Sequence, residues 1–334
     1  MKRVAVIGGG SWGTALAIVA ARAGYEVRLW SRNAAVVESI NRERVNPLYL
    51  TDTRVPDAVR ATDVIGDSVN GAELVILAAP SHATRSLLEA LAAWLRPEML
   101  LVSATKGIEV ETGKRISQIV AEVIPDAARP RFVCLSGPSF AKEVVENHPT
   151  AVVAASDDRE AGRMVQATLS FDNLRIYTND DVVGTELGGS VKNVMAIAAG
   201  MVAGLGFGAN SIAALITRGL AEITRLALRE GAKAETLVGL AGMGDLVLTC
   251  TGSLSRNRFV GQELGRGRSL DEITAKMNEV AEGVKTTEAV KRLADRAGVG
   301  MPITDEVHAV LYQGKSVRAA ARELMTRPLR DENR

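Results

Sequence analysis

The feature that most constrains the fold is the segment GGGSWG at residues 8–13, which follows a short β-branched run over residues 4–7 and opens a helical pattern. The spacing Gly-x-Gly-x-x-Gly between a strand and a helix is typical of a loop that binds the pyrophosphate of a dinucleotide. Gly8 would allow the tight turn, Gly10 would let the backbone approach the anion, and Gly13 would let the helix pack on the strand. A glycine-rich turn without a ligand is the alternative.

Strand and helix patterns alternate through the first half of the chain, which predicts a parallel sheet with helices on both faces, an α/β doubly wound sheet of the Rossmann type. Strand-like alternation then disappears near residues 180–189, so the rest is expected to be all-α. We place the domains at residues 1–188 and 189–334, packed tightly with a cleft between them. The expected strands cover residues 4–7, 26–30, 74–79, 100–103, 132–135 and 151–155, and the expected helices cover residues 11–23, 83–95, 190–205, 209–230, 234–240, 255–264, 286–297 and 303–312.

Composition excludes several classes of partner. Lys and Arg total 40 against 39 Asp and Glu, a net charge of +1, and aromatic residues make up only 4%. Neither a basic field for nucleic acid nor a base-stacking platform is therefore expected. The three histidines are scattered and the two cysteines, Cys134 and Cys250, cannot form a disulfide framework, so we predict no metal site. A magnesium site built only from carboxylates is the alternative.

Residues 193–217 carry no charge and are long enough to span a bilayer. Glycines and the polar pair Asn210 and Ser211 interrupt this stretch, which favours two buried core helices joined by a glycine-rich turn; a membrane span is the alternative. The apolar run near the N-terminus breaks at residues 8–10 without a small-residue cleavage site, so no signal peptide is expected. We expect a cytoplasmic protein.

The end of the second strand indicates which dinucleotide binds. A site that prefers NAD usually carries Asp or Glu there, which holds the ribose 2′-hydroxyl. Residues 29–33 contain no acid, and Arg32 could pair with a 2′-phosphate. We predict that NADPH is preferred and NADH is tolerated, with a solvent-facing arginine as the alternative.

Polar residues follow two other expected strands, where sites in such sheets collect. Lys106 could polarise a substrate oxygen or bind a phosphate, and the turn at residues 136–141 offers a hydroxyl and free N–H groups. Lys192 lies at the expected start of an apolar helix, where burial and the helix dipole would both lower its pKa, as suits a proton-transfer lysine. The alternatives are an exposed lysine, an ordinary Gly-Pro turn and a snorkelling lysine.

A phosphate site is predicted at the start of the helix over residues 255–264. Ser255 has the character of an N-cap, which places Arg256 in the first turn. A cation there opposes the helix dipole unless an anion lies between it and the free N–H groups. A capped surface helix is the alternative. Cys250 has no neighbouring histidine, which favours a structural role over a nucleophilic one.

Taken together and in order, six segments resemble the bacterial type of NAD(P)-dependent glycerol-3-phosphate dehydrogenase. The resemblance implies reversible reduction of dihydroxyacetone phosphate to sn-glycerol 3-phosphate, which supplies glycerophospholipid synthesis, in an enzyme that is usually a homodimer. It covers essentially the whole chain. The segments lie at residues 8–13, 105–109, 136–141, 188–193, 242–257 and 280–283.

The resemblance also implies roles for individual residues. Lys192 would donate the proton to the ketone and accept it in reverse, and Lys106 would touch both cofactor and substrate. Positions that match substrate contacts are Lys106, Gly137, Ser139, Lys192, Asp245, Thr249, Ser255, Arg256 and Asn257, the last two nearest the phosphate. Positions that match or adjoin cofactor contacts are Gly8, Gly10, Ser11, Trp12, Gly13, Arg32, Lys106, Ala141, Arg256, Val280 and Glu282.

Two other functions remain open. A related two-domain dehydrogenase could act on a β-hydroxyacid or on ketopantoate, and would then prefer a carboxylate without a phosphate. A non-catalytic dinucleotide sensor would bind NADPH without turnover and would have no use for Lys192, Asp245 and Arg256 together. Many polar residues fall at expected cleft positions, which favours an enzyme.

Overall fold

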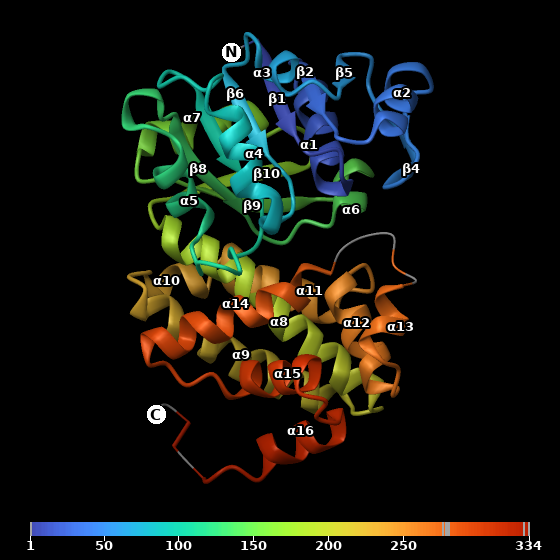
Figure 1. Ribbon diagram of the computed structural model, residues 1–334, viewed down its shortest axis with the longest axis vertical. Coiled ribbons are helices and arrows are strands. Elements are labelled where there is room, and N and C mark those ends of the chain that lie inside the picture. Colours follow the sequence, from blue (N-terminus) through green and yellow to red (C-terminus); the bar gives the residue numbers. More distant parts are fainter. Residues whose placement is uncertain (1, 276, 278–280, 330, 333–334) are drawn as a thin grey trace.

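The computed structural model describes residues 2–275, 277, 281–329 and 331–332. A half built around a sheet lies above a half built from helices (Figure 1). The fold class predicted from the sequence, a doubly wound α/β sheet followed by an all-α region, is confirmed.

The main sheet has eight strands in the order β10-β9-β8-β7-β6-β1-β2-β5. The chain builds outward from β1 through β2, then returns to the other side of β1 at β6, so the point where the strand order reverses lies beside β1. Ligands of doubly wound sheets bind at such a point, outside the carboxyl ends of the strands. The strands are β1 Arg3–Ile7, β2 Glu26–Trp30, β5 Val59–Thr62, β6 Leu74–Leu77, β7 Leu100–Ser103, β8 Arg131–Ser136, β9 Thr150–Ala155 and β10 Leu174–Asn179, with a separate hairpin of β3 Val45–Asn46 and β4 Leu50–Arg54.

Two details of the sheet differ from the prediction. Strand β9 runs antiparallel to β8, with Leu135 opposite Ala154, so the sheet is not parallel throughout. Strands β5 and β10 were not predicted. Both lie at the edges of the sheet, where alternate residues are exposed, and so they lack the continuous apolar run that marks a central strand.

Helices cover both faces of the sheet because alternate residues of a strand point in opposite directions. Val4 and Val6 of β1 lie in the core on the side of α1, whereas Ala5 and Ile7 lie in the core on the side of α4 and α5. The helices of this half are α1 Ser11–Arg22, α2 Ala34–Arg42, α3 Ile65–Val69, α4 Thr84–Leu91, α5 Ile116–Val123, α6 Ala141–Val145 and α7 Arg159–Leu169, with 3₁₀ turns η1 Ser81–Ala83 and η2 Asp126–Ala128.

The second half surrounds one long helix, α8 Val182–Gly204. This helix runs through the predicted domain boundary after residue 188, and that boundary stays a prediction. The other helices of this half are α9 Ala209–Arg229, α10 Ala234–Leu237, α11 Asp245–Thr251, α12 Arg256–Gly265, α13 Leu270–Thr274, α14 Glu282–Ala297, α15 Pro302–Tyr312 and α16 Val317–Met325, with a π-helical turn η3 Leu240–Gly244 between α10 and α11.

By length and composition, α8 could cross a membrane, but 83% of its most apolar window is buried inside the protein. A second stretch passes the same test only if residues 234–251 and 256–265, bent by 48°, are taken as one span. The prediction of two core helices holds for α8. It is wrong in part for α9, which exposes one face and buries residues such as Leu215, Ile223 and Leu226.

Glycines set the distance between α8 and α12. A Cβ on Gly200 would lie 2.0 Å from the Arg258 carbonyl oxygen, and a Cβ on Gly261 would lie 1.9 Å from that of Ile197. The two backbones can approach this closely only because neither position carries a side chain. Since Lys192 lies on α8 and Arg256 begins α12, this contact also sets the spacing between two of the predicted site residues.

We expect Gly261→Ala to lower the free energy of unfolding by about 1–3 kcal/mol, the usual cost of overpacking. The added methyl group meets backbone, which cannot move aside as the end of a flexible side chain can. Denaturant unfolding followed by circular dichroism measures the change. Gly300→Ala is the matched control, because a Cβ at Gly300 meets nothing within 4 Å. Equal losses in the two variants would contradict this account of the crossing.

Candidate active site

The glycine-rich segment forms the turn that its spacing predicts. Gly8 has φ +130°, and a Cβ there would lie 2.6 Å from the carbonyl oxygen of Ala78, which directly follows the neighbouring strand β6. A Cβ on Gly13 would lie 1.9 Å from the Gly8 carbonyl oxygen. Gly10 caps α1 and has no neighbour within 4 Å of its Cβ position, so its backbone faces open space at the helix N-terminus.

Sequence reasoning missed the residue that holds this loop. Asn46 is fully buried, and its side-chain amide donates hydrogen bonds to the Gly9 carbonyl oxygen at 2.9 Å and to the Thr14 hydroxyl at 2.8 Å. The contact joins residues more than thirty positions apart. An isolated asparagine before an irregular segment gives no local signal of such a role.

The residues at this end of the sheet fit a dinucleotide. The turn leaves the N–H groups at the start of α1 without helical partners, as an anion site requires. Trp12 Nε1 is buried and has no hydrogen-bond partner within the described residues. Arg32, two residues after the end of β2, is exposed, as a residue that meets a phosphate would need to be. The next residue, Asn33, caps α2, and its side chain accepts hydrogen bonds from the N–H groups of Ala35 and Val36.

The centre of the site is a carboxylate between two lysines. Asp245, which begins α11, is 1% exposed. Its Oδ1 accepts a hydrogen bond from Lys192 Nζ at 2.5 Å, and its Oδ2 accepts one from Lys106 Nζ at 2.8 Å. Lys106 comes from the loop after β7 and Lys192 from α8, so this carboxylate joins the sheet half to the helical half.

The prediction that Lys192 lies at the start of its helix is wrong. Lys192 lies in the middle, because α8 begins ten residues earlier at Val182. The helix dipole therefore does not explain its properties. The pKa of Lys192 is lowered to about 8, chiefly by burial. The ammonium group of Lys106 also lowers this pKa, and the Asp245 carboxylate raises it. Thr249 Oγ1 accepts a second hydrogen bond from Lys192, at 2.8 Å.

The turn after β8 reaches the same centre. Lys106 Nζ donates to the Gly137 carbonyl oxygen at 2.9 Å and lies 3.5 Å from Ser139 Oγ. The hydroxyl of Ser139 donates to the same carbonyl oxygen. Gly137 has φ +133°, which favours glycine, and Ala141 begins the short helix α6. The structure thus brings together six of the predicted substrate positions: Lys106, Gly137, Ser139, Lys192, Asp245 and Thr249.

The predicted phosphate segment begins α12. Ser255 caps this helix by accepting from the Arg258 N–H, and Arg256 occupies the first turn with its side chain exposed, as predicted. Asn257 is buried, and its Oδ1 accepts a hydrogen bond from the N–H of Gly283 at 2.9 Å. This bond, which the sequence did not indicate, ties α12 to the start of α14.

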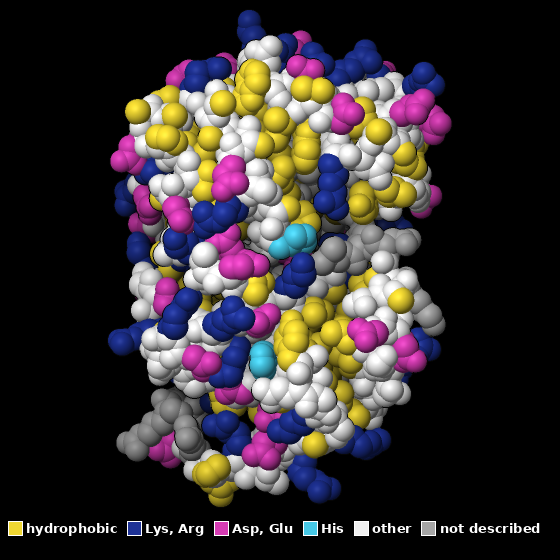
Figure 2. All heavy atoms as spheres, in the orientation of Figure 1, with side chains coloured by type: hydrophobic (Ala, Val, Ile, Leu, Met, Phe, Trp, Pro, Cys, Tyr) yellow, Lys and Arg dark blue, Asp and Glu magenta, His cyan; other side chains and the backbone are white. Residues whose placement is uncertain are grey.

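Glu282 begins α14 and faces the sheet half. A Cβ on Gly107 would lie 3.4 Å from its Oε2, and the Ser81 backbone N–H donates to its carboxylate. Burial raises the pKa of Glu282 to about 7. Val280, the other predicted cofactor contact in this segment, lies outside the described residues. Figure 2 shows Lys and Arg side chains interspersed with Asp and Glu side chains across the middle of one face, over the junction of the two halves.

Neither a reactive cysteine nor a cluster of metal-ligating side chains is found in the described part of the chain. Burial raises the pKa of the Cys250 thiol to about 12, which disfavours the nucleophilic thiolate. Burial also raises the pKa of Cys134 well above its usual value. No group of three or more His, Cys, Asp or Glu side chains among these residues is placed to hold a metal ion.

The fold, the glycine turn and the two lysines on Asp245 define the class of two-domain dehydrogenases that use a nicotinamide dinucleotide. Residues 3–162 match the family described as NAD-dependent glycerol-3-phosphate dehydrogenase N-terminus, and residues 181–322 match its C-terminus. The chain belongs to the NAD-dependent glycerol-3-phosphate dehydrogenase family.

Individual relatives match over almost their whole length. The glycerol-3-phosphate dehydrogenase [NAD(P)+] of Koribacter versatilis is 54% identical over 98% of this chain and 98% of its own. The one of Geobacter sulfurreducens is 51% identical over 99% of both chains. Among solved structures, glycerol-3-phosphate dehydrogenase from Coxiella burnetii is similar with a TM-score of 0.94 and 39% identity, covering 98% of this chain and 99% of that one.

Proposed function

We propose that the chain catalyses the reversible, NAD(P)H-dependent reduction of dihydroxyacetone phosphate to sn-glycerol 3-phosphate. The observation that carries this proposal is the pair of lysines on Asp245, of which Lys106 lies in the loop after the carboxyl end of β7. Two ammonium groups share one carboxylate there, so the site keeps an excess of positive charge for an anionic substrate and for the developing alkoxide.

In this proposal Lys192 transfers the proton. Its lowered pKa lies close to neutral pH, where a general acid can both hold and release a proton. Asp245 and Thr249 fix the direction of its ammonium group. Lys106 stabilises the negative charge that develops on the substrate oxygen, and Gly137 and Ser139 hold Lys106 in place.

Arg256 and Asn257 bind the substrate phosphate at the N-terminus of α12, where an exposed arginine and helix N–H groups favour an anion. Ser255 orders that helix end as its cap. The nicotinamide dinucleotide supplies the hydride, which is the difficult part of the chemistry, so the protein needs only to orient the ketone, donate a proton and exclude water.

The cofactor positions are Gly8, Gly10, Ser11, Trp12, Gly13, Arg32, Lys106, Ala141, Arg256, Val280 and Glu282. The open space at Gly10 and the unpartnered Trp12 Nε1 support binding at this loop. The absence of an acid after β2, with Arg32 exposed there, supports a preference for NADPH with NADH tolerated.

The place of the enzyme in the cell follows from its product. We infer a cytoplasmic homodimer that supplies glycerophospholipid synthesis. Exposed apolar side chains on the helical half support association of two copies; Val238 is 62% exposed, and Met243 and Val247 are each 41% exposed.

The test of this function is NADPH oxidation by purified protein with dihydroxyacetone phosphate, beside ketopantoate and a control without ketone. We expect oxidation with the phosphorylated ketone only. Turnover of ketopantoate alone would mean that the phosphate site is misassigned, and NADPH binding without any turnover would favour a sensor.

In the same assay, Arg256→Ala should mainly raise KM for the phosphorylated ketone. Equal losses for phosphorylated and unphosphorylated ketones would contradict the phosphate role.

Lys192→Ala should lower kcat by about 10²–10⁴-fold, the usual loss on removing a proton-transfer group. Because the pKa of Lys192 is about 8, kcat/KM for ketone reduction should fall as the pH rises through 8, while kcat/KM for alcohol oxidation should rise. Steady-state kinetics from pH 6 to 10 measures both profiles. Lys233→Ala, which removes an exposed lysine paired with Asp180, is the control. Profiles that move in the same direction would remove Lys192 from this role.

Arg32→Ala should raise the Kd for NADPH while leaving the Kd for NADH nearly unchanged, because only NADPH carries the 2′-phosphate. Fluorescence titration with each cofactor measures both constants. Arg42→Ala, on an exposed residue of the following helix that pairs with Glu38, is the control. An unchanged ratio of the two constants in Arg32→Ala would assign the 2′-phosphate to another residue.

A further inference from the structure

Three residues after Lys106 lies a buried carboxylate that the reaction does not use. Glu109 is 6% exposed. Its N–H donates to the Lys114 carbonyl oxygen at 3.0 Å, and its own carbonyl oxygen accepts from the Gly113 N–H at 2.8 Å. These two bonds close residues 109–114 into a compact turn, so the backbone that leaves the Lys106 loop has a fixed shape.

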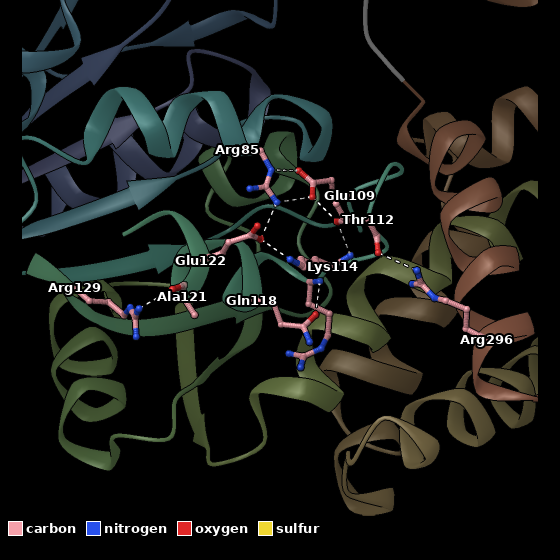
Figure 3. A network of polar contacts seen from close by, with 10 residues as sticks. Arg85, Glu109, Thr112, Lys114, Gln118, Ala121, Glu122, Arg129 and Arg296 are labelled. Atoms are coloured by element: carbon pink, nitrogen blue, oxygen red, sulfur yellow. Dashed lines mark hydrogen bonds and ion pairs between the residues drawn. The ribbon is translucent and has the colours of Figure 1, made fainter. Parts of the chain in front are cut away.

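The side chain of Glu109 is held as firmly as its backbone. Arg85, in the first turn of α4, donates two parallel hydrogen bonds to the two carboxylate oxygens, each 2.8 Å long (Figure 3). The Thr112 hydroxyl donates a third. These bonds from Arg85 hold the pKa of Glu109 below its usual range. Two-point pairs between arginine and carboxylate fix orientation as well as distance.

The two residues between Lys106 and Glu109 are closely packed. A Cβ on Gly107 would lie 2.5 Å from Ser81 Oγ, so the backbone there presses against the loop after β6. Ile108 is 1% exposed and packs in the apolar core of the helical half, beside residues such as Leu187 and Val191. Any displacement of Glu109 therefore passes along a short, tightly packed stretch to Lys106.

The turn also contacts α14, which belongs to the helical half. Arg296 Nη1 donates to the Thr112 carbonyl oxygen at 3.0 Å, and Arg292 Nη1 donates to that of Val110 at 3.4 Å. Figure 3 shows Arg85 and Arg296 reaching the turn from opposite sides. The turn is thus anchored to the sheet half through α4 and to the helical half through α14.

We propose that Arg85 and Glu109 are positioning residues for the reaction, which set the place of Lys106 in the site through the packed stretch 107–108. This inference rests on the proposed function, since it assumes that Lys106 acts on the substrate. The pair itself lies outside the network of Lys106, Lys192 and Asp245. It acts through the backbone and not by contact with substrate or cofactor.

A merely stabilising ion pair and a positioning pair make different predictions. A stabilising pair would lower activity only as far as it lowers the folded fraction, and its effect would be the same whether or not Lys106 is present. A positioning pair changes kcat/KM in the folded enzyme and does so through Lys106. Its effect should therefore vanish once the Lys106 side chain is removed.

The experiment is a double-mutant cycle of Glu109→Gln and Lys106→Ala. Steady-state reduction of dihydroxyacetone phosphate gives kcat/KM, thermal unfolding gives Tm, and fluorescence titration gives the Kd for NADPH. We expect Glu109→Gln to lower kcat/KM by about 10–100-fold in the wild-type background, the scale of a displacement of about 1 Å. In the Lys106→Ala background the same change should cost less than about twofold.

Two further variants complete the design. Arg85→Lys keeps the charge but loses the two-point contact, so it should reproduce part of the loss even where Glu109→Gln folds poorly. Glu122→Gln is the matched control, because Glu122 contacts the side chains of Arg85, at 3.1 Å, and Lys114, at 2.6 Å, but lies on α5 and is exposed. It should leave kcat/KM within about twofold of the wild type.

The outcomes separate this inference from the function on which it rests. Equal losses from Glu109→Gln in both backgrounds, or wild-type kcat/KM in both Glu109→Gln and Arg85→Lys, would overturn the positioning role. If Lys106→Ala itself kept wild-type activity, the proposed role of Lys106 would fail first. A large effect of Lys106→Ala, with a loss from Glu109→Gln that disappears in the double variant, would support both.

Discussion

The rest of the site depends on the carboxylate of Asp245. It lies almost wholly out of solvent and binds one ammonium group from the sheet half and one from the helical half. Without a counter-charge, the buried Lys192 and the half-buried Lys106 would repel each other and lose hydration of their charges. The carboxylate offsets both costs, and because its two oxygens serve different halves of the molecule, the same interaction also aligns those halves.

Glycines allow the layers around α8 to come this close. A Cβ on Gly188 would lie 2.5 Å from the Ala241 carbonyl oxygen of the turn before Asp245, and a Cβ on Gly189 would lie 2.5 Å from Ser136 Oγ at the end of β8. Further along, Gly200 meets α12. One helix therefore presents successive glycines to three different neighbours, and Lys192 lies among them. Helix α8 therefore carries Lys192 and packs closely against the elements that carry Asp245 and the predicted phosphate segment.

The parts of this arrangement that could be predicted from sequence are those with a local signal. The glycine turn, the central strands and the Ser255 cap each depend on residues a few positions apart. The start of α8 was misplaced because Gly184, Gly188 and Gly189 argue against a helix locally, although Asp181 provides a side-chain cap. These glycines let neighbouring segments pack closely against α8, and this tertiary packing outweighs their low helix propensity. Asn46 and the pair of Arg85 and Glu109 were missed because their partners are distant in sequence.

Charge explains why such a site suits a phosphorylated substrate in a chain that is nearly neutral overall. Lys106, Lys192 and Arg256 supply positive charge, whereas Asp245 and Glu282 supply the opposing carboxylates. Burial raises the pKa of Glu282 to about 7, which disfavours its charged form. With both lysines and Arg256 charged, the site is positive whether or not Glu282 is ionised. Charge of one sign concentrated where two halves meet attracts an anion without a basic surface elsewhere. Burial, with a smaller effect of the Lys106 ammonium group, leaves Lys192 near its titration point, where proton transfer in either direction is possible.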